Sequence, residues 1–253
     1  MYTDEQFEAL EQEELEITDE AIMLMFGLLL SVKTDIEQEL RAFYQKYGQD
    51  GIVTYAEARK WISEKNHQRR LTALLLVVGG SFLSTFDDLE THFRKFLIDV
   101  IGKESTFFGI EIDVDKVLTR KWGVDDLYWL ERLDADVNLW QNHIANDIKQ
   151  ALHQGKHLDD VLKKLDKRFK SINSVLETLG ISESTAVGSL ARQSIFKELG
   201  ITKYQFYTQV DERRCKTCGA LHGVIFPISS FEVGVTASPL HPRCRCWEVP
   251  IME

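Results

Sequence analysis

A cluster of cysteines and a histidine near the C-terminal end contains the residues best suited to chemistry. All four cysteines of the chain lie within 32 residues, at Cys215, Cys218, Cys244 and Cys246. Two thiolates at CxxC spacing can hold one metal ion because a tight turn directs both sulfurs inward, and Gly219 allows such a turn. The spacing predicts one structural zinc ion per chain.

Two sets of further ligands are compatible with this spacing. They are Cys244 and Cys246, which lie on one side of an extended strand, or His241 and Cys244, with Pro242 stiffening the connection. Four protein ligands leave no position for a catalytic water, so the metal is expected to stabilise the fold, by on the order of 10 kcal/mol in small zinc domains. A redox or disulfide role is the alternative for the four cysteines.

The composition is that of a globular protein. The chain has 253 residues, 44% of them hydrophobic, and four prolines, which favours one or two compact domains. Its longest nearly uncharged apolar run, residues 21–32, is shorter than the roughly 20 residues that cross a bilayer. Acidic residues precede this run, unlike in a secretory signal. We therefore expect a cytosolic protein without a membrane partner, in which thiols stay reduced.

Charge is unevenly distributed along the chain. Residues 1–50 contain 13 acidic and three basic residues, and so account for the whole net charge of −10. Blocks of like charge are usually solvated or contact a partner, so residues 1–20 are expected to be a mobile or partner-facing acidic segment. A locally basic run at residues 156–170 is either a solvated helix face or a phosphate-binding stripe, although aspartates interleave with its lysines.

Apolar residues recur at three- and four-residue steps before residue 200, which is typical of helices. Helices are expected at residues 18–47, 55–78, 85–101, 125–152, 158–172 and 182–199. Gly79 and Gly80 are expected to interrupt the second helical block, and residues 103–115 are turn-rich. The expected division is an acidic segment at 1–20, a helical arm at 21–115, a helical middle region at 116–200 and a β-rich zinc module at 201–253.

The periodicity changes at residue 201. Alternating or β-branched runs at residues 203–210, at 223–228 and from 246 onward indicate three short strands. The CKTC motif lies between the first two strands and HPRCRC lies just before the third, so pairing of the strands would bring the cysteine groups together. The predicted class is α+β, mostly helical with a small C-terminal zinc-stapled β module.

The order of these C-terminal motifs resembles the phage Mu protein F family of minor head and head morphogenesis proteins. The residues that carry the resemblance are DERRCKTCGALHGVIF followed, after a gap, by SPLHPRCRC. Upstream the similarity is weaker, with Trp122-Gly123, Gly155 and Leu199-Gly200 in fitting positions. Where the family tends to have Arg-Thr-Glu, this chain has Ile181-Ser182-Glu183. The resemblance covers roughly residues 115–250.

This resemblance implies a structural virion component rather than an enzyme. Such proteins associate with the phage portal during assembly in the host cytoplasm, lie inside the head and accompany DNA packaging or ejection. The implied partners are the portal protein, the major capsid or scaffold protein, and packaged double-stranded DNA. The implied candidates for DNA phosphate contact are Lys163, Lys164, Lys167, Arg168, Arg213, Arg214, Arg243 and Arg245.

Two other functions compete with a structural role. A zinc-containing nuclease or other DNA-acting enzyme would need further carboxylates or histidines around a second metal or a water. Near the cysteines the candidates are Asp211, Glu212, His222 and Glu248. A zinc-ribbon adaptor for nucleic acid is disfavoured, because residues 201–253 hold six basic residues against five acidic ones.

Overall fold

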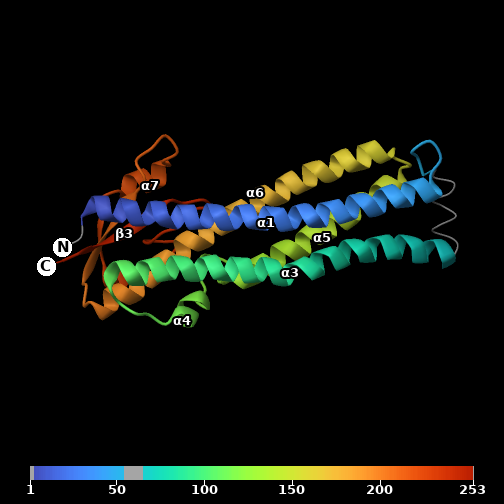
Figure 1. Ribbon diagram of the computed structural model, residues 1–253. Coiled ribbons are helices and arrows are strands. Elements are labelled where there is room, and N and C mark those ends of the chain that lie inside the picture. The colour runs from blue at the N-terminus through green and yellow to red at the C-terminus, as the bar shows by residue number, and fades with distance from the viewer. Residues whose placement is uncertain (1–2, 54–64, 253) are drawn as a thin grey trace. The chain divides into compact units, whose positions relative to one another are not determined.

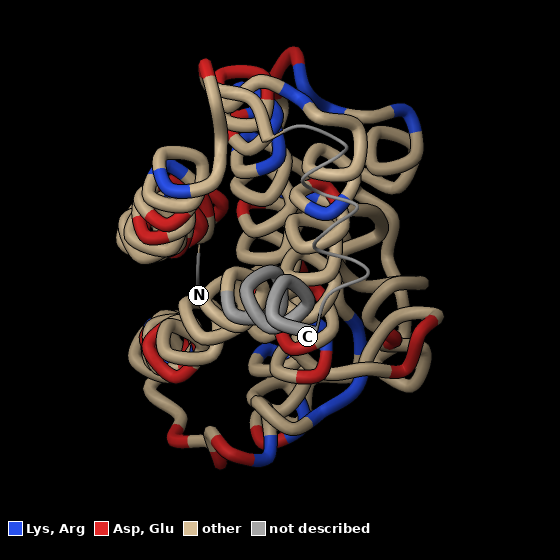
Figure 2. The backbone as a smooth tube through the Cα atoms, turned by 90° about the vertical axis from the view of Figure 1, so that its right-hand side faces the viewer, with Lys and Arg blue, Asp and Glu red and all other residues tan. Residues whose placement is uncertain are grey.

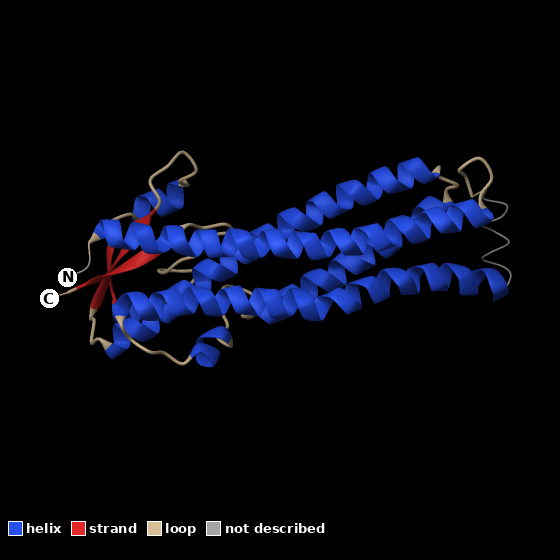
Figure 3. Cartoon of the chain, in the orientation of Figure 1, coloured by secondary structure: helices blue, strands red, loops and turns tan. Residues whose placement is uncertain are grey.

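The computed structural model describes residues 3–53 and 65–252, with side chains from residue 74 onward in the second stretch. Figure 1 labels its main elements, and Figure 3 shows that helices make up most of them. The helices are α1 (Asp4–Tyr47), α3 (Lys65–Phe108), α4 (Val114–Leu118), α5 (Trp129–His153), α6 (Leu158–Glu198), α7 (Lys216–Leu221) and a 3-10 turn (Ile228–Ser230). The strands are β1 (Lys203–Thr208), β2 (Ile225–Pro227) and β3 (Cys246–Ile251). The predicted α+β class is confirmed.

Helix α1 begins 14 residues before the predicted start at Thr18. Phe7 and Leu10 are buried because they lie on one face of the helix, while Glu8 between them faces solvent. The buried hydroxyl of Thr18 donates to the carbonyl oxygen of Glu14, one turn back, and to Ser184 Oγ. Thr18 is thus an interior helical residue, and residues 4–20 form the first turns of α1. That this acidic segment faces a partner stays a prediction.

Two further helices continue where the sequence predicted a break. Helix α3 runs through Gly79 and Gly80, and reaches Phe108 in the stretch predicted to be turn-rich. A Cβ at Gly79 would lie 2.8 Å from Gln141 Nε2, so this glycine permits close packing of α3 against α5. Helix α6 runs through Ser182, which donates to the carbonyl of Thr178 in its own helix instead of capping a new one. The part of the second predicted helix at residues 55–64 lies outside the described residues.

The three strands form one antiparallel sheet in the order β2-β1-β3. Tyr204 of β1 lies opposite Phe226 on one side and Pro250 on the other, and Thr208 lies opposite Cys246. Alternate residues of β1 are buried, as expected for a strand with one covered face. The predicted positions of all three strands are confirmed.

The described chain divides into two compact units. Unit 1 comprises residues 1–23, 92–132 and 176–253, and therefore contains the sheet and the cysteines. Aromatic rings pack in series through it: Phe7 on Phe108, Phe108 on Phe196, Phe196 on Phe231, and Phe231 on Tyr204, with centroid separations of 4.7–6.4 Å. These contacts join segments that are far apart in the sequence, and they fix the sheet against α6.

Unit 2 comprises residues 24–91 and 133–175, and its described part is mainly helical. Its core includes Leu29, Ile36, Trp140 and Ile144, all at most 3% exposed. Lys33 of α1 forms an ion pair with Asp166 of α6. The four-segment division expected from the sequence stays a prediction. Across the described residues, no helix has an apolar stretch long enough to span a bilayer.

Candidate metal centre

The CKTC motif forms the start of the short helix α7. Cys215 is the N-cap residue, and its sulfur accepts a hydrogen bond from the backbone N–H of Cys218 at 3.3 Å. The N–H of Gly219 donates to the Cys215 carbonyl at 2.9 Å. These bonds close the turn that directs both sulfurs to the same side, as the CxxC spacing predicted.

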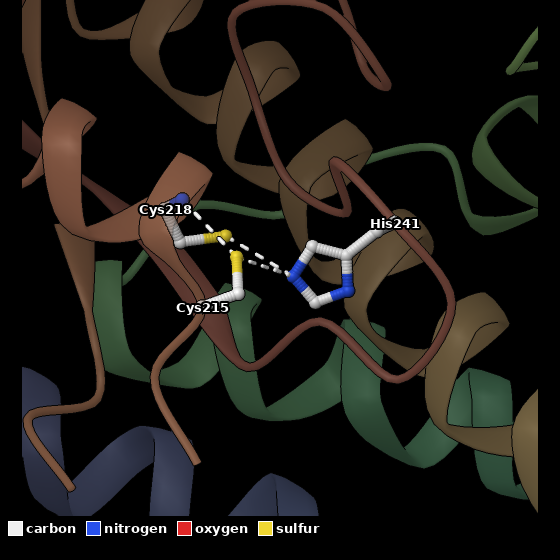
Figure 4. Close-up of side chains that lie close together, drawn as sticks. All are labelled: Cys215, Cys218 and His241. Carbon is white, nitrogen blue, oxygen red and sulfur yellow. Dashed lines mark hydrogen bonds between the residues drawn. The ribbon is translucent and has the colours of Figure 1, made fainter. Parts of the chain in front are cut away.

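His241 completes a three-residue group with the CKTC cysteines (Figure 4). Its Nε2 atom lies 3.2 Å from the sulfur of Cys215 and 3.2 Å from that of Cys218. Its other ring nitrogen, Nδ1, lies 2.8 Å from the carbonyl oxygen of Pro242. A proton on Nδ1 donated to this carbonyl leaves the lone pair of Nε2 free for a metal, which is the usual arrangement of a metal-ligating histidine.

Cys244 and Cys246 form a second group with Cys218. The ligand atoms of each group lie within 4.8 Å of one another, and Cys218 belongs to both groups. The sulfurs of Cys218 and Cys244 are 3.8 Å apart, which matches the separation of about 3.8 Å between two thiolates on a tetrahedral zinc ion. These five residues could therefore hold one metal ion, with one of them left over.

The environment of the sulfurs favours thiolate at two positions. The backbone N–H of Cys218 lowers the pKa of Cys215. The hydrogen bond from the thiol of Cys246 lowers the pKa of Cys244 to about 6, although burial opposes it. Burial raises the pKa of Cys218 to about 12. All four cysteines are free of disulfides.

Helix α6 holds the turn that carries His241 and Cys244. The backbone N–H of Arg243 donates to Ser182 Oγ at 3.1 Å, and its guanidinium forms an ion pair with Glu177 at 2.9 Å. Thr185 Oγ1 donates to the carbonyl oxygen of Cys244 at 2.9 Å. The segment that departs from the family's Arg-Thr-Glu thus contributes a hydroxyl that supports the ligand turn.

The eight cations predicted to contact DNA are divided equally between the two units. Lys163, Lys164, Lys167 and Arg168 belong to unit 2, whereas Arg213, Arg214, Arg243 and Arg245 belong to unit 1. Several are neutralised by carboxylates: Asp147 pairs with Lys164 and Arg168, and Asp211 pairs with Arg245 at 2.7 Å. Figure 2 shows basic and acidic positions interspersed along the chain. Their contact with DNA stays a prediction.

Three of the four groups considered for nuclease chemistry have other partners, and the fourth, Glu212, is exposed. Asp211 pairs with Arg245, and His222 Nδ1 accepts the backbone N–H of Thr208 at 3.3 Å. Glu248 is fully buried and accepts hydrogen bonds from hydroxyl groups, including that of Ser189 at 2.8 Å. None of these three side chains is thereby aimed at the metal cluster as a free base.

A second buried cluster was not anticipated from the sequence. Arg192 of α6 lies within 4.0 Å of four carboxylates contributed by three other elements. The carboxylates are those of Glu11, Glu14, Glu104 and Glu248. No sequence spacing could reveal this group, apart from the three-residue step from Glu11 to Glu14 on one helix face.

One guanidinium cannot neutralise four buried carboxylates, so the pKa values of several of these carboxyl groups are raised. Burial raises the pKa of Glu11 to about 7, although Arg192 opposes the rise. Burial and the neighbouring Glu104 raise the pKa of Glu14, and burial raises the pKa of Glu248. Although three of the carboxylates lie close enough to hold a cation, Arg192 already lies among them, and the cluster is best described as a structural network that takes up protons.

Comparison with known proteins finds the family that the C-terminal motifs resemble. Residues 142–249 match the family described as Phage Mu protein F like protein. No curated protein and no solved structure matches the chain. The matched residues include every candidate metal ligand and all of α6, which supports the ligand turn. The resemblance predicted from the sequence is thus confirmed over residues 142–249, which are similar to the phage Mu protein F-like family.

Proposed function

We propose that this protein is a structural minor head protein of a tailed bacteriophage, acting in head morphogenesis. The observation that carries the proposal is the family match at residues 142–249, within which the cysteine and histidine cluster lies. The partners proposed are the portal protein and the major capsid or scaffold protein, and the proposed location is the head interior. A role in DNA packaging or ejection belongs to the same proposal.

A zinc ion would act as a staple in this protein. The ligands proposed are Cys215, Cys218, His241 and Cys244. His241 Nε2 lies 3.2 Å from the sulfurs of Cys215 and Cys218, and the sulfurs of Cys218 and Cys244 lie 3.8 Å apart, which suits one tetrahedral ion. Cys246 then donates its thiol hydrogen to the Cys244 sulfur and packs beside Phe206 in the core. With four protein ligands, the ion has no open position for a reacting water.

Metal content tests the proposed ligand set. Protein purified without chelators should contain about one zinc per chain by elemental analysis. Cys244→Ser should lose most of this zinc, while the matched variant Cys246→Ser should retain it. The opposite pattern would exclude the proposed set, and wild-type protein without metal would exclude the site.

Incorporation into heads tests the proposed role. When the protein is produced together with its phage's portal, scaffold and capsid proteins, it should sediment with the assembled heads. Cys218→Ser should reduce its incorporation, because the loosened module no longer presents a fixed surface. Normal incorporation of a metal-free variant would contradict a stabilising role of the zinc ion. Absence of the wild-type protein from heads would contradict the structural role of the protein itself.

The alternative, a zinc-containing nuclease, receives less support from the geometry. Of its four candidate bases, Asp211, His222 and Glu248 each already have a hydrogen-bond or ion-pair partner, and Glu212 is exposed. Purified protein is therefore expected to leave double-stranded DNA intact in the presence of Mg²⁺ or Mn²⁺.

A further inference from the structure

A pocket in unit 1 lies beside Arg120, and none of the proposed metal ligands lines it. Its volume is about 320 Å³, and its walls come from the segment after α4, from α6 and from the loop after the 3-10 turn. Its apolar lining consists of Trp122, Val124, Leu190, Phe231, Val233 and Val235. Small-ligand pockets begin at about this size, so the space suits one side chain of a bound peptide and the residues that flank it.

A buried glutamine holds Arg120 at this pocket. Arg120 Nη2 donates to Gln193 Oε1 at 2.6 Å, and Gln193 Nε2 donates to the carbonyl oxygen of Phe231 at 2.7 Å. Gln193 is only 6% exposed. Because both ends of its amide are engaged, the guanidinium is held in one place without being neutralised.

Arg120 lacks a charge partner within the described part of the chain. No carboxylate there lies within salt-bridge distance of it, and its partial burial lowers its pKa. The contrast is Arg132 in the same unit, which pairs with both Asp125 and Glu183. A desolvated cation without a counter-charge is costly. A carboxylate brought in by a ligand would remove this cost.

Other charged groups at the pocket limit what can bind. Lys121 is paired with Glu131 at 3.2 Å, so it is not a second free cation. Asp126 and Glu232 also line the pocket. A polyanion such as a nucleic acid would be repelled by these two carboxylates, whereas a single carboxylate placed against Arg120 would be tolerated.

We propose that this pocket binds the Asp or Glu side chain of an extended segment in a partner protein. Val124 is fully exposed and Val235 is 59% exposed, so both offer apolar surface to residues that flank the acidic one. Charge complementarity with Arg120 selects the acidic residue, and the apolar lining selects its neighbours. This inference goes beyond the proposed function, since it names the chemistry of a partner and requires no metal.

A matched pair of peptides tests the proposal on the full chain. The probes are N-acetyl-Leu-Glu-Leu-amide and its neutral analogue N-acetyl-Leu-Gln-Leu-amide. Their binding is followed by NMR of the protein's arginine side-chain N–H and valine methyl groups. The Glu peptide should shift Arg120, Val124 and Val235 saturably and bind about tenfold more tightly than the Gln peptide. Arg120→Gln should abolish this preference, and Arg94→Gln, which removes an exposed arginine, should preserve it.

Three results would overturn the proposal. They are equal binding of the two peptides, an unchanged preference in Arg120→Gln, and tighter binding of a short oligonucleotide at the same resonances. If Arg120→Gln does not fold, the wild-type protein still decides, since only the binding of the Glu peptide should weaken as salt rises.

Discussion

Replacing Glu11 by glutamine should make the free energy of unfolding less dependent on pH. In the folded protein, burial raises the pKa of Glu11 from 4.5 to about 7. The folded state therefore binds this proton more tightly than the unfolded state does. The resulting stability is fully present below pH 4.5 and is lost as the pH rises through 7. The difference between the folded and unfolded pKa values corresponds to about 3 kcal/mol of folding free energy.

Urea unfolding followed by tryptophan fluorescence between pH 5 and 8.5 measures this effect. Glu11→Gln cannot ionise, so it should match the wild type at the acidic end and exceed its stability by up to about 3 kcal/mol at pH 8.5. Glu8→Gln is the matched control, because Glu8 is exposed on the same helix. Equal pH dependence in Glu11→Gln and Glu8→Gln would refute the reasoning, as would wild-type stability that increases over the same range.

Two further substitutions test the packing of each unit by the same unfolding measurement. Arg132→Met should cost about 3–5 kcal/mol, because it leaves the buried carboxylate of Glu183 without its cation; a loss below 1 kcal/mol would contradict this. Gly51→Ala should cost more than about 1–2 kcal/mol, because φ is +74° and the new Cβ would lie 2.4 Å from His157 Nε2. Gly109→Ala has a similar φ but open space, so an equal loss there would exclude a steric contribution.

The C-terminal module could be predicted from the sequence because its signals are local. The alternation of β1, the CxxC turn and the His-Pro turn each occupy only a few residues. Strand pairing then places Cys246 opposite Thr208 and brings the two cysteine groups together. Fixed backbone geometry thus converts short sequence motifs into a site.

Helix boundaries could not be predicted where tertiary packing overrides local preference. Thr18 resembles an N-cap, but its hydroxyl bonds to Ser184, which is 166 residues away in the sequence. Gly79 resembles a helix break, but it lies against Gln141. The network around Arg192 was missed for the same reason, because its members come together only in the folded chain.

Strand β3 carries two chemically different groups on the same face. Cys246 faces the sulfurs of Cys218 and Cys244, and Glu248, two residues later, faces Arg192. Any displacement of this six-residue strand moves a sulfur and a buried carboxyl together. We therefore expect a metal ion bound at the proposed site and a proton bound at Glu248 to be coupled, each changing the affinity for the other through the backbone of this single strand.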